Sequence, residues 1–436
     1  MRDLMLLAVI SSVLVAALRY PFLGIIAWAW FSLMTPQQMA YGIWGVQLNT
    51  LIAVIAITAI ALRGDFAKFR LDKTTVLLLS LGVWLFFSQI RSMDPGYSNE
   101  FFQRFEKTLL FAILVTQTVN TPLKLNALVW VFVLSIGFFA TKGAIFTIIT
   151  LGQFHVQGLP NTVLEDNNHL GIAMATSLPM ILYLRTVSQR HAVKIALTAL
   201  FLMTVLAILG TQSRGAFLSL VAFSIFFWVR SKHKFVILAA GILIAAPAIS
   251  FMPKSWTNRM ETITDAGEDA SFMGRVDAWI INAKLAVKHP LTGAGLRNPY
   301  QESIARTVDT ERTPRAAHSI YFELLGGAGF IGLTIYAALL GTALLTAIRL
   351  ARSRLMPIDQ SWSTRFANFT TISLVVFYVG GASTSMEMWD GYLLLIALIA
   401  ATEKILRSQS DFSMATISWR GESRRIPTAK KSRSTS

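Results

Sequence analysis

The chain has 436 residues, of which 54% are hydrophobic and only 14% are charged. A soluble globular protein carries about 25% charged residues, and the mean hydropathy of this chain is +0.55, so an ordinary soluble enzyme is excluded. The sequence contains no cysteine, which excludes disulfides, thiolate metal sites and a cysteine nucleophile.

Apolar runs of a length suited to helices recur along most of the chain. Alternating strand patterns of about ten residues, which are typical of an outer-membrane barrel, do not occur. We therefore predict an all-α, polytopic membrane protein. The predicted spans lie near residues 4–18, 22–34, 48–62, 74–90, 107–119, 126–151, 168–185, 193–210, 214–230, 235–252, 319–348, 366–384 and 388–405.

The first 47 residues leave two alternatives for the number of spans. If residues 4–18 and 22–34 each cross, the chain has about thirteen spans and its N-terminus lies outside. If the stretch interrupted at Pro21 crosses once, the chain has about twelve spans and its N-terminus lies inside. Both runs are short for a full crossing, so we expect twelve.

Short connectors rich in Lys and Arg set the orientation, because such loops stay in the cytoplasm. The basic connectors are residues 63–73, 185–194, 230–234 and 349–365. The same alternation of sides places the polar segment 253–317 outside, as one large periplasmic loop. Val276, Ile280 and Ala283 recur in this loop at helical spacing, so we expect amphipathic helices in it.

The chain therefore divides into four predicted parts. A transmembrane bundle (1–252) precedes the periplasmic loop (253–317), and C-terminal spans (318–405) precede a basic tail (406–436), which we expect to be cytoplasmic and disordered. The net charge of +16 is concentrated in the tail and the short loops. We attribute it to anchoring at the membrane surface rather than to nucleic-acid binding.

Arg214 lies between two predicted spans with almost no loop to separate them. A charge near the bilayer centre costs about 2.5–3.5 kcal/mol on insertion scales, so this arginine needs an anion, carbonyl groups or water. Snorkelling to the headgroups is the alternative. The small residues Gly215 and Ala216, which follow it, favour close packing around the guanidinium.

His318 ends the long polar segment, and several glycines follow it on the next turns. Those small residues let another helix or a ligand come close. A histidine at a membrane surface can do acid–base work near neutral pH, although taken alone His318 could equally be a structural hydrogen-bonding residue. Glu323, one turn further, could orient its ring or pair with an arginine, and His169 could contact substrate sugars.

Several short motifs follow one another in the second half of the chain. They are Ser213-Arg214-Gly215, Gly274-Arg275 with Trp279, Pro290 with Gly293-Ala294-Gly295, and His318-Ser319-x9-Gly329-x2-Gly332. This series resembles the bacterial O-antigen ligase and polymerase family. The basic tail, the length and the N-terminal pattern look most like the O-glycosylation ligases associated with exosortase systems.

The resemblance implies a GT-C-type glycosyltransferase of the bacterial inner membrane. Such an enzyme transfers a saccharide from undecaprenyl diphosphate to an acceptor hydroxyl (of a protein, a lipid A core or a polysaccharide) at the periplasmic face, with inversion. It implies that Arg214 and Arg275 hold the diphosphate and that His318 is the essential histidine. Lys107 matches a family lysine that precedes an early span, and with Glu323 and His169 it completes the predicted substrate-binding residues.

Other interpretations remain open at this point. A polymerase would use a second lipid-linked glycan as the acceptor, and a transporter or flippase would bind the same donor without reaction; no internal repeat of the kind common in transporters is visible. We expect no cofactor and no metal, because arginines can neutralise a diphosphate. An acidic group in the long loop could nevertheless coordinate a divalent ion. Its residues are Asp265, Glu268, Asp269 and Asp277.

Overall fold

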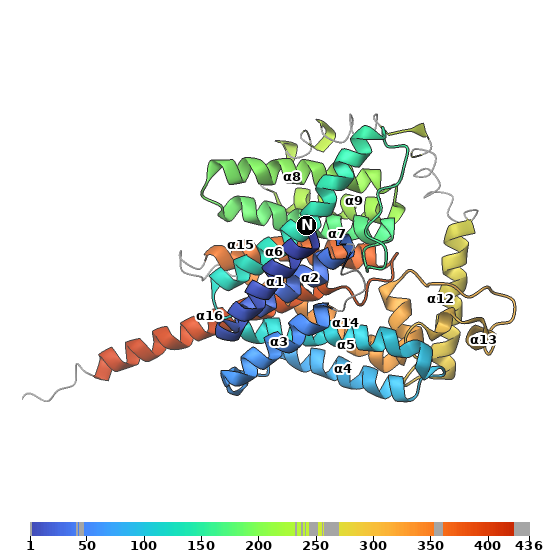
Figure 1. Cartoon of the computed structure of the whole chain (residues 1–436), viewed down its shortest axis with the longest axis horizontal. Helices are drawn as coiled ribbons and strands as arrows, with labels where there is room; N and C mark the ends of the chain where they lie inside the picture. The colour runs from blue at the N-terminus through green and yellow to red at the C-terminus, as the bar shows by residue number, and fades with distance from the viewer. Residues whose placement is uncertain are drawn as a thin grey trace, which may run out of the picture.

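The computed structural model describes residues 2–40, 42, 48–231, 233–236, 239, 241–243, 252–254, 256, 270–352 and 361–422. All the regular structure in these segments is helical (Figure 1). The predicted all-α class is therefore confirmed for the described residues.

Five of the described helices are long and apolar enough to cross a membrane, as expected for a helical membrane protein. They are α4 (Lys73–Ile90), α6 (Pro122–Ile149), α7 (Asn167–Val187), α8 (His191–Gly210) and α14 (Ile320–Arg352). The helices packed around them are α1 (Arg2–Arg19), α2 (Pro21–Met34), α3 (Leu48–Leu62), α5 (Pro95–Thr118), α9 (Arg214–Arg230), α15 (Ser361–Gly381) and α16 (Asp390–Glu422). The total number of crossings stays a prediction.

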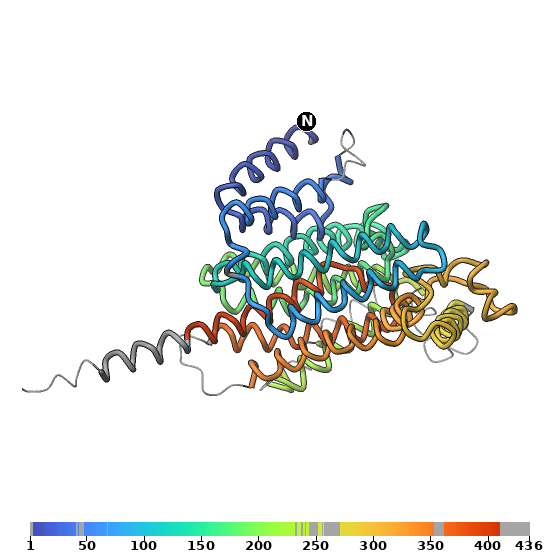
Figure 2. The backbone as a smooth tube through the Cα atoms, turned by 90° about the horizontal axis from the view of Figure 1, so that it is seen from below, coloured from blue at the N-terminus to red at the C-terminus, as the bar shows by residue number. Residues whose placement is uncertain are grey.

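The first two helices form a hairpin rather than one interrupted helix. Helices α1 and α2 pack side by side (Figure 2), and Asp3 near the start of α1 lies against Gly42, beyond the end of α2. Pro21 occupies the first position of α2, where a missing N–H costs nothing, so it starts a helix rather than bending one. Whether the two helices cross a membrane separately stays a prediction.

Two helix boundaries differ from those predicted by hydropathy. Helix α5 begins at Pro95 rather than near residue 107, because Asp94 caps it by accepting a hydrogen bond from the Tyr97 N–H at 3.0 Å. The added turns are polar, so an apolar window does not detect them. Helix α16 continues to Glu422 rather than ending at 405, and the rest of the predicted disordered tail lies outside the described residues.

Helix α12 (Ala270–Lys288) lies across one end of the bundle, roughly perpendicular to its long helices (Figures 1 and 2). The short helices η3 (Asn298–Tyr300) and α13 (Glu302–Ala305) follow it. The chain between them inserts against α14, which is broken at Gly329 (φ 72°, ψ −174°). Glycine is required there because this backbone conformation is closed to other residues.

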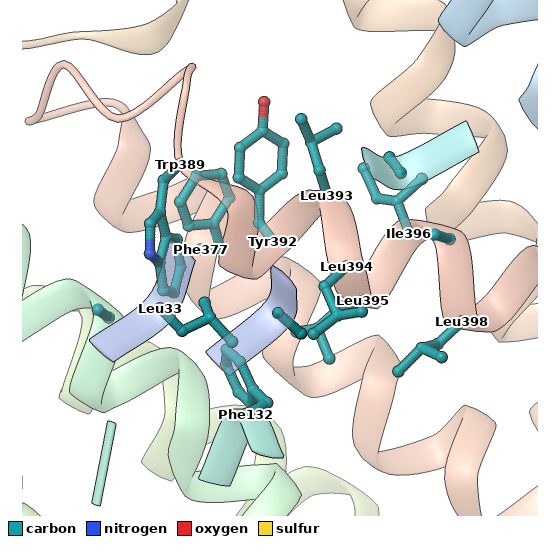
Figure 3. Close-up of a cluster of buried hydrophobic side chains, with 14 of the residues drawn as sticks. Leu33, Phe132, Phe377, Trp389, Tyr392, Leu393, Leu394, Leu395, Ile396 and Leu398 are labelled. Carbon is teal, nitrogen blue, oxygen red and sulfur yellow. The ribbon is translucent and has the colours of Figure 1, made fainter. Parts of the chain in front are cut away.

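The start of α16 passes through the centre of the bundle (Figure 3). Every residue from Tyr392 to Ile399 is fully buried. Phe377 of α15 stacks on Tyr392 with ring centroids 4.2 Å apart, and Phe132 of α6 lies 6.1 Å from Trp389. This packing holds the start of α16 against α6 and α15.

Candidate functional site

Helices α7, α9 and α14 all begin at the end of the bundle that α12 crosses. Side-chain hydrogen bonds join the first two: Asn167 donates to the Thr211 carbonyl at 2.8 Å, and the Ser213 hydroxyl donates to Asn168 at 2.6 Å. Each helix N-terminus carries a partial positive charge of roughly half an elementary charge. Their meeting point therefore favours an anion.

A cavity of about 180 Å³ lies at this meeting point. It is lined by Asp166, Asn168, Arg214, Ser271, Arg275, Arg315 and His318. The structure thus brings together the three residues that we predicted to be catalytic, from α9, from α12 and from the segment before α14. We call this cavity, with its seven lining residues, the His318 cavity.

Arg214 is held by a tight turn between α8 and α9. The Ser213 hydroxyl caps α9 by accepting a hydrogen bond from the Ala216 N–H at 3.0 Å, and Gln212 adopts a left-handed conformation (φ 52°). A Cβ atom on Gly215 would overlap the Ser383 hydroxyl, so glycine lets α9 approach the α15–α16 connector. Arg214 is therefore placed by backbone geometry, as its short flanking residues predicted.

Helix α12 is locked to the segment that carries His318. The Trp279 indole N–H donates to the Ala317 carbonyl at 2.7 Å, and its ring stacks on Phe322 at 5.2 Å with a 7° interplanar angle. Because Arg275 lies one turn before Trp279, these contacts fix its distance from His318. A Cβ atom on the neighbouring Gly274 would overlap the Arg315 guanidinium, so glycine admits a third arginine, which sequence reasoning had left without a role.

His318 is held in an uncommon backbone conformation and is largely buried. Its backbone is left-handed (φ 46°), and its Nδ1 atom is buried without a hydrogen-bond partner among the described residues. Burial, then the positive charges of Arg275 and His169, lower the pKa of His318 to about 4, against the opposing effect of Asp166 and Glu323. The imidazole is therefore neutral at neutral pH and able to accept a proton.

Glu323 does not line the His318 cavity; it pairs with an arginine, one of the two roles expected for it, and its contact with substrate stays a prediction. Its Oε1 atom accepts hydrogen bonds from the Ala317 N–H at 3.0 Å and from the Ser385 hydroxyl at 2.6 Å. It also pairs with Arg297 at 3.0 Å. The carboxylate therefore fixes the backbone next to His318.

Arg297 joins the long loop to two buried carboxylates, those of Glu323 and Glu387. Burial lowers the pKa of Arg297, but the two carboxylates outweigh it and raise that pKa overall. Burial raises the pKa of Glu387 to about 7, with Arg297 opposing and Glu323 adding to the rise. Sequence reasoning missed this cluster, although the signal was a glutamate in a short connector between apolar segments.

Comparison with known proteins gives two matches to family models. Residues 198–337 match the family described as O-antigen ligase, and residues 1–189 match a family of unknown function. Residues 198–337 are an O-antigen ligase domain. No curated protein matches the chain.

The O-antigen ligase domain supplies Arg214, Arg275 and His318, while Asp166 and Asn168 come from the other matched region. The cavity is therefore formed between the two. His169 belongs to that other region and lies just behind the lining: its Nδ1 is 2.8 Å from the Val163 carbonyl.

Lys107 does not line the cavity beside the O-antigen ligase domain. Its ammonium donates to the Thr50 hydroxyl of α3 at 3.3 Å. Arg104, one turn earlier on α5, lies near Asp390 and Arg297 instead. Arg104 and Lys107 are therefore about one helical turn apart on α5; Arg104 lies toward the Arg297 cluster, and Lys107 contacts α3.

Two further interpretations of the ligase domain can be compared with the structure. The Gly295 N–H donates to the Gly327 carbonyl at 3.0 Å and the Gly293 N–H to the His289 carbonyl at 2.9 Å, so the segment Gly293-Ala294-Gly295 is a turn held against α14. Of the acidic group, Asp277 pairs with Arg312 at 3.1 Å, and the other three residues lie outside the described part of the chain.

Proposed function

We propose that this protein is a membrane glycan ligase, which transfers a saccharide from undecaprenyl diphosphate to an acceptor hydroxyl. The O-antigen ligase domain supports a membrane function in glycan transfer of the ligase or polymerase type. The observation that carries the narrower proposal is the convergence of Arg214, Arg275 and His318 on one small cavity.

The donor diphosphate would lie among three guanidinium groups, from Arg214, Arg275 and Arg315. A guanidinium binds phosphate oxygens with two parallel hydrogen bonds. Three helix N-termini at the same place add to the attraction. As the sugar leaves, negative charge grows on the diphosphate, and these fixed positive groups stabilise it. They supply the charge that a divalent ion supplies in other enzymes, so the proposed reaction requires no metal.

His318 would act as the general base. The acceptor hydroxyl loses its proton to the neutral imidazole, its oxygen forms a bond to the anomeric carbon, and the bond from that carbon to the diphosphate oxygen breaks. Undecaprenyl diphosphate leaves with the electron pair. One direct displacement inverts the anomeric configuration. The lowered pKa of His318 keeps the imidazole ready to accept this proton at neutral pH.

The membrane orientation is part of the proposal. The basic connectors favour an orientation with the His318 cavity on the periplasmic side of a bacterial inner membrane and the C-terminus in the cytoplasm. A lipid diphosphate carries its charge at headgroup level and its tail in the bilayer, which suits a cavity at the end of a helical bundle. The likeness to exosortase-associated O-glycosylation ligases favours a protein hydroxyl as the acceptor. The fold that we propose for such a membrane glycosyltransferase is of the GT-C type.

The test is a reaction with defined components. Purified protein receives an undecaprenyl-diphosphate-linked glycan and candidate acceptors, and the release of undecaprenyl diphosphate is measured with the glycosylated product. We expect release that depends on the acceptor. Elongating lipid-linked chains would favour a polymerase, and movement of the donor across vesicles without release would favour a transporter.

A further inference from the structure

A second and much larger cavity, of about 1280 Å³, lies at the opposite end of the bundle. It is enclosed by the ends of α3, α5, α14 and α16 and by the α3–α4 connector. Its charged lining residues are Arg63, Arg70, Lys73, Lys124, Arg349, Lys404 and Arg407 with Asp65, Asp72 and Glu403. We call it the basic cavity.

Two of the acidic residues are already engaged by cations of α14 and α16. Lys404 pairs with Asp72 at 2.7 Å, and Arg349 pairs with Glu403 at 2.6 Å, which Arg407 also contacts. Burial alone would raise the pKa of Asp72, but Lys404 and the hydrogen bonds from Thr75 lower it overall, so the carboxylate stays ionised. These pairs close one wall of the cavity.

The other wall has an excess of positive charge. Arg63 and Arg70 lie on the α3–α4 connector and Lys73 begins α4, and none of these three side chains is in an ion pair among the described residues. The lining holds seven cationic side chains and three carboxylates, two of which are paired with cations of α14 and α16. Such an excess of positive charge attracts a multiply charged anion, and the attraction falls off within about 8 Å at physiological salt. The wall is therefore suited to a phosphate group.

Apolar side chains lie beside these cations. Phe22, Phe69 and Leu345 line the same cavity. Leu345 is 68% exposed, and Leu71 on the connector is 73% exposed. A water-soluble anion needs no such surface. Cations for a headgroup beside apolar side chains for acyl chains are typical of a lipid site at the cytoplasmic surface of a membrane bundle.

We propose that the basic cavity binds the headgroup of an anionic phospholipid, such as phosphatidylglycerol or cardiolipin. The lipid phosphate lies against Arg63, Arg70 and Lys73, and an acyl chain follows the apolar side chains toward the bilayer. This site is at the far end of the bundle from the His318 cavity and does not depend on the proposed ligase activity. A bound lipid there joins the α3–α4 connector to α14 and α16.

The experiment measures bound lipid on the full-length protein. The protein is purified in nanodiscs that contain phosphatidylglycerol, cardiolipin and phosphatidylethanolamine, and the retained lipids are counted by native mass spectrometry. A variant with Arg63→Gln, Arg70→Gln and Lys73→Gln is compared with wild type. The matched control carries Arg185→Gln, Arg190→Gln and Lys194→Gln, which removes the same charge from a connector that does not line the cavity.

We expect wild type to retain anionic lipid over phosphatidylethanolamine, and the cavity variant to lose roughly tenfold to a hundredfold in affinity. The control variant should lose less than about threefold. Equal losses in both variants, equal retention of phosphatidylethanolamine, or unchanged binding by the cavity variant would overturn the proposal. Complete displacement of the lipid by inorganic pyrophosphate would also overturn it, in favour of a soluble anion.

A second measurement keeps the test decisive if the triple variant does not fold. Photoreactive phosphatidylglycerol is crosslinked to the wild-type protein, and the modified peptides are mapped. We expect crosslinks on the α3–α4 connector and on α14 around Leu345. Crosslinks spread evenly over the outer helices would show only the general lipid annulus and would refute a defined site.

Discussion

The two ends of the bundle both gather arginines, but they arrange them differently. At one end Arg214 and Arg275 line a cavity of about 180 Å³. At the other end the cations line a cavity of about 1280 Å³ and sit on connectors and exposed helix ends. The first arrangement is fixed by caps, stacking and a buried ion cluster, and the second by surface ion pairs. Charge alone therefore does not identify chemistry; a rigid placement beside a titratable group does.

The largest expected effect tests whether the His318 end is the reactive one. His318→Ala removes the proposed base, so we expect turnover to fall by about a hundredfold to ten thousandfold. Binding of the donor should stay within about twofold, because the arginines remain. Turnover and donor binding are measured on the same preparation, with His233→Ala at the opposite end as the matched control. Full activity of His318→Ala would remove the base from the mechanism.

The next effect concerns stability and the buried cluster that only the His318 end possesses. Arg297→Met leaves Glu323 and Glu387 buried without their cation, and breaking a buried pair in this way costs about 3–5 kcal/mol. Thermal unfolding in detergent should show a clear loss. Arg306→Met, which breaks the exposed pair with Glu302, should be close to wild type. Equal stability of the two variants would show that the cluster is not a structural support.

The third effect separates binding from turnover. Each charge-assisted hydrogen bond contributes about 1.5–3 kcal/mol, so Arg214→Ala should weaken donor binding by roughly tenfold to a hundredfold. Arg214→Lys keeps the charge but loses the planar fork, and it should restore only part of the affinity. Donor affinity is measured by titration without an acceptor. Unchanged affinity in Arg214→Ala would refute the diphosphate clamp.

The sequence predicted more of the helices than of their ends. Hydropathy located the apolar stretches, but it placed the start of α5 too late, since residues 95–106 are polar and yet helical. It could not separate a hairpin from an interrupted crossing at Pro21, because both have the same apolar pattern. The break at Gly329 depends on a loop that inserts beside it, and a linear pattern does not contain that contact.

The candidate site divides in the same way. The motif order pointed to Arg214, Arg275 and His318, which the structure brings together. It did not point to Arg315 or to the Arg297 cluster, because those residues acquire their places through contacts between distant segments. Lys107 was one helical turn from the arginine that approaches the site. Lys107 contacts Thr50 of α3 instead of lining the cavity, and its role in binding substrate stays a prediction.

A smaller effect uses pH to distinguish the two ends. His318 must be neutral to accept a proton, so activity is lost as pH falls through its pKa, which is about 4 in the free protein. We expect the acid limb of kcat/KM near that value, and the limb of kcat at higher pH, because the bound diphosphate adds negative charge. Arg275→Gln removes a positive neighbour and should move the kcat/KM limb to higher pH. An unmoved limb would mean that His318 is not the titrating group.

The smallest effect comes from a pair of identical substitutions, one at each end. Trp279→Phe keeps an aromatic ring to stack on Phe322 but loses the hydrogen bond to the Ala317 carbonyl, which holds the residue before His318. Trp228→Phe removes an equivalent indole bond, to the Lys234 carbonyl, at the opposite end. A single hydrogen bond contributes about 0.5–1.5 kcal/mol, so Trp279→Phe should slow turnover by about threefold to tenfold while Trp228→Phe leaves it unchanged. If both variants slow turnover equally, the effect of Trp279→Phe does not come from the hydrogen bond beside His318. The two ends would then not differ in how rigidly their side chains are positioned.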